Sequence, residues 1–181
     1  MTATSLRDGK VRRIALDAAL LCIALALSYL EHLIPLSLAI PLPGFKLGFA
    51  NLAVVAAAFL ISPVDAGIVS LARVAVSSLL FGSPSSFFFS LGGAVLSFIS
   101  IIISKYCLCR VSGWIGISVI SAACHNIGQL IAAALVLSSL SVWWYFPVLM
   151  IAAALTGTLS GIILMLIMPR LTKAVKNANR N

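Results

Sequence analysis

The sequence has few charged residues, and acidic ones are the rarest. Asp and Glu number 4 in 181 residues, and charged residues together make up 9%, against about 25% in a soluble domain. Magnesium bound to a phosphate group needs carboxylate ligands close together. The chain cannot supply such a pair, because its acids are scattered along the sequence at Asp8, Asp17, Glu31 and Asp65.

Other catalytic and metal-binding patterns are also missing. Cys107 and Cys109 form a short cluster without histidine, which falls below the four ligands of a structural zinc site. The phosphate-binding pattern G-x-x-x-x-G-K-[ST] is absent, and no acid is placed to form a nucleophilic triad with His125. We therefore expect no catalytic residue, no metal and no cofactor, and we interpret the protein as a non-enzyme.

Long apolar segments dominate what is present. Hydrophobic residues make up 62% of the chain, and the mean hydropathy is +1.17. Because about 20 apolar residues cross a bilayer as a helix, we expect an all-α, multi-pass membrane protein with six transmembrane helices. The predicted spans are approximately 14–34, 47–62, 64–80, 87–104, 114–137 and 147–168, and the second is short enough to be tilted, re-entrant or extended into the loop before it.

The distribution of lysine and arginine predicts the orientation. With six spans, ten of the 12 basic residues fall on one side of the membrane, which the positive-inside rule identifies as the cytoplasmic side. We expect a basic cytoplasmic segment at 1–13, a membrane domain at 14–168 and a basic cytoplasmic tail at 169–181. The location is the cell membrane, and the net charge of +8 indicates anionic lipid and not nucleic acid as the charged partner.

Small residues recur at helical spacing in several predicted spans. Ala153, Gly157 and Gly161 form one stripe, and Ala15 with Ala19 forms another. Close approach of two backbones at such residues holds membrane helices together. The spacing alone leaves open whether each stripe packs within the protein or docks a separate membrane subunit.

Strongly polar residues inside the predicted spans are the candidate site. A charged side chain in the membrane is costly and marks a functional position by default. Two interpretations are open: an internal network, for example Glu31 paired with Lys46 or Arg73, and a ligand pocket that opens outward, with a net basic charge that favours an anionic or carbonyl-rich ligand. The candidate ligand-binding residues are Glu31, Lys46, Asn51, Arg73, His125, Asn126 and Gln129.

Four features of the sequence together resemble the Gx transporter family, often labelled heptaprenyl diphosphate synthase component I. They are the run Pro43–Asn51, the isolated Arg73, the step Ser90-x-Gly92-Gly93 and the pattern His125-Asn126-x-x-Gln129. The family is similar to the substrate-binding S components of energy-coupling factor transporters. The resemblance implies an S-component-like six-helix bundle, capture of a small molecule near the outer surface, and partnership with a transmembrane coupling subunit and cytoplasmic ATPases.

The resemblance also gives Ala15 and Ala19 the position at which S components contact the coupling subunit. We expect a substrate-binding subunit that captures a small organic solute, vitamin-like or precursor-like, from outside for ATP-driven import, with the loop 35–46 covering the pocket. The alternative is a non-catalytic membrane subunit that serves isoprenoid, quinone or extracellular redox enzymes. The scattered acids exclude the prenyl diphosphate synthase activity itself, because that chemistry needs paired aspartates for magnesium.

Overall fold

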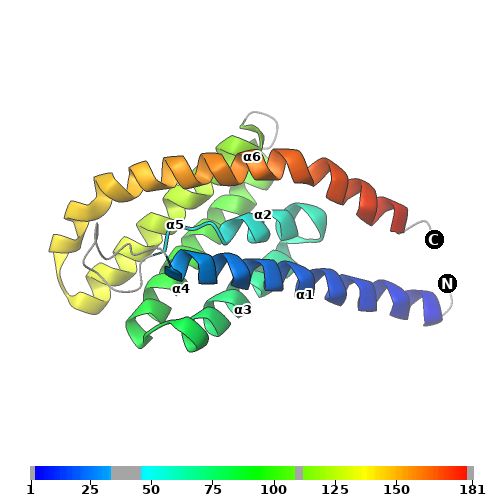
Figure 1. The fold of residues 1–181 in the computed structure, drawn as a ribbon, viewed down its shortest axis with the longest axis horizontal. Helices are drawn as coiled ribbons and strands as arrows, with labels where there is room; N and C mark the ends of the chain where they lie inside the picture. The colour runs from blue at the N-terminus through cyan, green and yellow to red at the C-terminus, as the bar shows by residue number, and fades with distance from the viewer. Residues whose placement is uncertain (1–2, 34–45, 109–111, 179–181) are drawn as a thin grey trace.

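The computed structural model describes residues 3–33, 46–108 and 112–178, and all regular structure in these ranges is helical. The expected all-α class is confirmed (Figure 1). A π-helix (η2, Ser104–Leu108) continues the fourth α-helix, and a 3-10 helix (η3, Leu140–Tyr145) precedes the sixth. The α-helices are α1 (Ala3–Leu33), α2 (Asn51–Leu60), α3 (Pro63–Phe81), α4 (Pro84–Ile103), α5 (Gly113–Leu137) and α6 (Phe146–Ala178).

Among these described helices, five are long and apolar enough to cross a membrane: α1, α3, α4, α5 and α6. Helix α2 has 10 residues and spans about 15 Å at 1.5 Å per residue, roughly half of the hydrocarbon layer. Residues 46–48 lead into it without helical structure. The short second segment is thus a half-length helix preceded by non-helical chain, and the count of six spans stays a prediction.

Two of the long helices begin with the same local device. Ser62 accepts a hydrogen bond from the backbone N–H of Asp65 (3.3 Å), and Pro63 follows at the first helical position. Ser83 and Pro84 begin α4 in the same way, with Ser86 as the donor. A serine cap satisfies a free backbone N–H, and proline tolerates the first turn because its missing N–H has no partner there. This explains why short Ser-Pro turns suffice between α2, α3 and α4.

Glycine brings the backbones of α4, α5 and α6 into direct contact. A Cβ atom on Gly128 would lie 2.2 Å from the carbonyl oxygen of Gly92. On the opposite side of α5, a Cβ on Gly157 or Gly161 would lie 2.6 or 2.4 Å from the Cα atoms of Val119 and Ile115, respectively. The stripe that includes Gly157 and Gly161 therefore packs within the protein.

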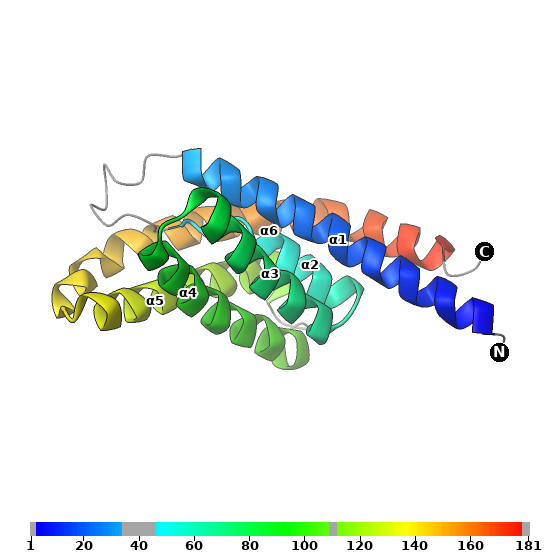
Figure 2. The same ribbon diagram turned by 90° about the horizontal axis from the view of Figure 1, so that it is seen from below.

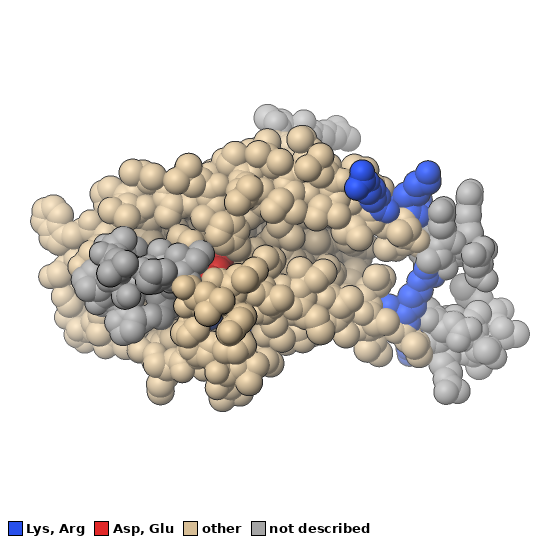
Figure 3. All heavy atoms as spheres, in the orientation of Figure 1, with Lys and Arg blue, Asp and Glu red and all other residues tan. Residues whose placement is uncertain are grey.

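Both chain termini lie at the same end of the molecule, as Figures 1 and 2 show from two directions. Lysine and arginine side chains gather at that end in the view of Figure 3, over the start of α1 and the end of α6. This arrangement agrees with the charge pattern, although which side of the membrane it faces stays a prediction. Both helices exceed their predicted spans: α1 begins at Ala3, and α6 continues through Pro169 to Ala178.

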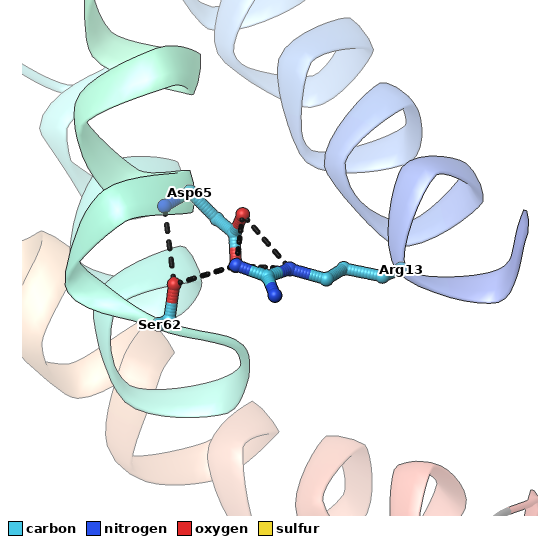
Figure 4. A network of polar contacts seen from close by, with 3 residues as sticks. All are labelled: Arg13, Ser62 and Asp65. Atoms are coloured by element: carbon cyan, nitrogen blue, oxygen red, sulfur yellow. Dashed lines mark hydrogen bonds and ion pairs between the residues drawn. The ribbon is translucent and has the colours of Figure 1, made fainter. Parts of the chain in front are cut away.

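An ion pair joins α1 to the turn before α3 at the end that carries the termini. The guanidinium of Arg13 donates from Nε and Nη2 to the carboxylate of Asp65, with distances of 2.8–3.0 Å, and from Nη2 to Ser62 Oγ (3.1 Å) (Figure 4). The stretch from Arg13 to Leu33 is about 30 Å long as a helix, which matches the hydrocarbon thickness of a bilayer. Arg13 is thus placed at one boundary of the apolar zone.

Two apolar cores lie along the bundle with polar residues between them. One core contains Val54, Val69 and Ile101, and the other contains Phe89 and Leu130. Along α5, His125 and Asn126 come after Ile117 of the first core and before Leu130 of the second. The candidate site therefore occupies the middle of the bundle.

Candidate functional site

Arg73 is the central cation of the site. It lies on α3, is 1% exposed, and its Nε and Nη2 atoms have no hydrogen-bond partner. The only ion pair among the described residues joins Arg13 to Asp65, so neither Glu31 nor any other described acid pairs with Arg73. A guanidinium keeps its charge at every accessible pH. Arg73 is therefore a permanent buried cation with two free donors.

Lys46 approaches Arg73 from the non-helical segment before α2. Its Nζ atom donates to Ser77 Oγ (3.1 Å), and Ser77 lies one helical turn beyond Arg73 on α3. The side chains of Lys46 and Arg73 are both buried, and Lys46 is 8% exposed. Two cations thus share one stretch of α3.

The backbone of this segment is held by side chains from three helices. Gln129 on α5 accepts from the N–H of Lys46 (3.1 Å) and donates to its carbonyl oxygen (3.0 Å). Thr156 on α6 donates to the carbonyl oxygen of Leu47 (3.2 Å), and Glu31 on α1 accepts from the N–H of Phe49. Non-helical backbone at membrane depth needs such partners, because lipid offers none.

Glu31 therefore makes a different contact from the one expected for an internal charge network. Its Oε1 atom is used by Phe49 at the entry to α2, and its Oε2 atom has no partner. The side chain is 2% exposed. A carboxylate next to a helix N-terminus is favourable, because free N–H groups and the helix dipole are positive there. The ion pairs of Glu31 with Lys46 or Arg73 are not formed among the described residues.

His125 and Asn126 face the same buried region from α5, and both are 0% exposed. The imidazole ring packs against α4 so closely that a Cβ on Gly93 would lie 2.7 Å from its Cε1 atom. Both ring nitrogens are without a hydrogen-bond partner. Asn126 donates to the carbonyl oxygen of Leu149 (2.8 Å), whereas its Oδ1 atom is free.

Asn51 completes the site from the first residue of α2. Both atoms of its amide lack a partner, although the residue is 4% exposed. It lines a cavity of about 10 Å³, which is the size of one water molecule. Gly48, with φ of +91°, lies beside both Asn51 and His125. A Cβ added to Gly48 would lie 3.4 Å from Asn51 Nδ2 and 3.5 Å from His125 Cδ2. An organic solute would need more space than the cavity provides here.

All seven predicted ligand-binding residues are therefore buried, and they come from α1, α2, α3, α5 and the segment before α2. The structure brings Lys46 and Gln129 into contact, and it places Asn51 and His125 beside the same face of Gly48. Ala15 and Ala19 are exposed on α1. Apart from Lys46, the predicted covering loop 35–46 lies outside the described residues.

The sequence analysis missed several supporting residues. Thr156 lies in an apolar span two residues before Thr158, which bonds only within its own helix, and nothing in the sequence indicated the bond of Thr156 to Leu47. Ser118 and Ser160 line the small cavity with Asn51, but serine is too frequent in this chain to stand out. The Arg13–Asp65 pair could have been suspected, because Asp65 is the acid nearest to a predicted helix start on the basic side.

Comparison with known proteins gives one match. No curated protein and no solved structure matches the chain. The model of the family described as heptaprenyl diphosphate synthase component I matches residues 20–167. That range contains every residue of the candidate site and most of the bundle. The chain is thus a multi-pass, all-helical protein that belongs to the heptaprenyl diphosphate synthase component I family.

Proposed function

We propose that the protein is the substrate-binding membrane subunit of an importer, which captures a small organic solute in the centre of its bundle. The observation that carries this proposal is the set of buried polar atoms without partners. An unpaired polar group in an apolar interior costs roughly 1–3 kcal/mol. Here such atoms come from Asn51, Arg73, His125, Asn126 and Glu31.

The distribution of these atoms supports binding over a purely structural role. A structural network would satisfy its own members, because a half-satisfied one is worse than apolar packing. Gln129 and Ser77 are satisfied in this way. The free atoms of the site come from four helices, α1, α2, α3 and α5, which is the arrangement of a site that a ligand completes.

The outward face of α1 supports coupling to a partner. Ala15 and Ala19 are exposed one turn apart, so no other helix of the described bundle covers them. Close helix contacts in membranes use small residues at this spacing. In the proposed mechanism a transmembrane coupling subunit with cytoplasmic ATPases docks on this face, and the termini lie in the cytoplasm of a cell whose plasma membrane holds the complex.

The family name favours a second candidate, an accessory membrane subunit. It describes one component of a synthase, and a component implies a partner subunit. The described acids favour a non-catalytic role in that assembly: Asp17 and Asp65 are both close to the cation Arg13, which binds Asp65, and Glu31 is at the other end of α1, next to α2. In this version the partner would be the catalytic prenyl diphosphate synthase subunit.

Native mass spectrometry of the tagged full chain, extracted gently from its own membrane, tests the two candidates. The importer subunit should retain a small molecule and should co-purify with a membrane subunit and ATPases. Arg73→Gln should lose the small molecule, and Ala154→Leu, an exposed change on α6, should keep it. A prenyl-synthase subunit recovered without any small molecule would replace the importer with the accessory role.

A further inference from the structure

We propose that the solute, on the function proposed above, carries a carboxylate or phosphate group, and that Arg73 and Lys46 bind this group together. The inference starts from the geometry of Arg73. Its free Nε and Nη2 atoms form the fork that donates two parallel hydrogen bonds to two oxygens of one anionic group. With 1% exposure, the guanidinium has no access to bulk water as a substitute.

The acids of the protein offset the charge of Arg73 and Lys46 only in part. Glu31 is the only acid near it, and its Oε1 atom is held by the N–H of Phe49. Neither Arg73 nor Lys46 lies within ion-pair distance of a carboxylate in the described part of the chain. The described site thus contains two formal positive charges and one negative charge, that of Glu31, and it keeps one unbalanced positive charge. A buried charge is retained when something pairs with it, and here the ligand is the remaining source of that partner.

Lys46 is placed to contribute to the same anion. Its ammonium donates to Ser77, one turn from Arg73 on the same helix, and an ammonium has three donors. Gln129 fixes the backbone of Lys46 from both sides, so the position of its side chain is set by the fold. The Lys46 ammonium and the Arg73 guanidinium repel each other, and an anion bound between them would remove this repulsion.

The neutral groups indicate what surrounds the anion. Asn51 offers a donor and an acceptor, and His125 offers one of each when neutral; all four atoms are free. These groups suit hydroxyl, amide or ring-nitrogen atoms on the rest of the solute. An organic cation is excluded, because it would bring a third positive charge into the described cluster.

Thermal unfolding of the purified full chain in detergent tests the inference with simple anions. Ligands that bind the folded state raise its stability, and 1 kcal/mol corresponds to about 2–4 °C for a chain of this size. At constant ionic strength, sodium phosphate or sodium acetate should raise the midpoint by at least about 2 °C, whereas tetramethylammonium chloride should not. A phosphate response indicates a phosphorylated solute, and an acetate response a carboxylate.

Three variants locate the response. Arg73→Gln should abolish it and Lys46→Met should weaken it, whereas Arg13→Gln, a change at the far end of α1, should retain it. Lys46→Met gives the answer if Arg73→Gln fails to fold. A response that survives unchanged in the folded variants would place the anion elsewhere and overturn the proposal.

The absence of any anion response in the unaltered protein would also overturn it. The outcome for the proposed function is then read separately. If the protein retains a neutral or cationic small molecule by mass spectrometry, the importer function stands without the anion site. If it retains no small molecule at all, both proposals fail.

Discussion

Gln129 binds the backbone of Lys46 through both atoms of its side-chain amide, accepting from the N–H at 3.1 Å and donating to the carbonyl at 3.0 Å. The two residues are far apart in sequence and come from α5 and the segment before α2. This pair fixes a non-helical segment inside the bundle, in the way that a neighbouring strand would fix it in a sheet.

Replacement of Gln129 by leucine should destabilise the protein. It keeps a similar volume but leaves the N–H and C=O of Lys46 unpaired, at roughly 1–3 kcal/mol for each buried group. The midpoint of thermal unfolding in detergent measures the loss. Thr158→Val is the matched control, because exposed Thr158 bonds only to Ala154 of its own helix. Equal midpoints for the two variants would show that the bonds from Gln129 to the backbone of Lys46 do not stabilise the protein.

Substitution of Gly128 by alanine should disrupt the contact between α4 and α5. The new Cβ would meet the carbonyl oxygen of Gly92 at 2.2 Å, and backbone cannot move aside as a flexible side chain can. We expect a loss of about 1–3 kcal/mol, as for other overpacked sites. Gly67→Ala is the control, since its Cβ would meet only the ring of Phe98 at 3.4 Å. Denaturation of both variants in the same detergent compares their free energies of unfolding. A Gly128→Ala variant as stable as the unaltered protein would refute the close contact between α4 and α5.

Enlargement of Ala19 tests the docking face of α1. Ala19 is exposed, so Ala19→Leu should leave thermal stability and solute retention unchanged while recovery of a membrane partner and cellular uptake fall. Ala154→Leu adds the same bulk on the exposed side of α6 and should leave partner recovery intact. A loss of stability in Ala19→Leu would show instead that this face packs within the protein. Full recovery and uptake would remove docking from α1.

Cysteine labelling of intact cells tests the topology in a background without native cysteines. An impermeant reagent should label positions 38, 84 and 141 from outside, and positions 109 and 176 only after permeabilisation. The physical reason is the concentration of basic residues at the end that carries both termini. Labelling of position 176 from outside would show that the C-terminal tail lies outside the cell. Either the predicted orientation or the predicted count of six spans would then be wrong.

The apolar segments predicted the helices well, because hydrophobic length and Ser-Pro starts are local properties. The third and fourth spans began within a few residues of Pro63 and Pro84. The ends of α1 and α6 were missed, since a basic sequence continues a helix beyond the membrane as readily as it ends one. The sixth predicted span ended at 168, whereas Pro169 lies inside α6.

Arg73 and His125 were found because polar residues are conspicuous in an apolar span. The residues that surround them could not be predicted, because those contacts depend on which helices are neighbours. Pairing of Glu31 with a cation belonged to one of the two open interpretations, and in the structure Glu31 accepts instead from the backbone at Phe49. Gln129 was grouped with the ligand-binding residues, although both of its amide atoms are used by Lys46. Distances between helices, and not residue type, decide such cases.

The glycine contacts of α5 divide the molecule mechanically. Helices α4, α5 and α6 touch backbone to backbone at Gly92–Gly128 and at Gly157 and Gly161, so we expect them to move as one rigid body. Helices α1, α2 and α3 pack on that body through side chains. His125 belongs to the rigid body, whereas Arg73 and Glu31 belong to the other three helices. Separation of these two halves would widen the small cavity beside Asn51, because that cavity lies between α2 and the serines of α5 and α6.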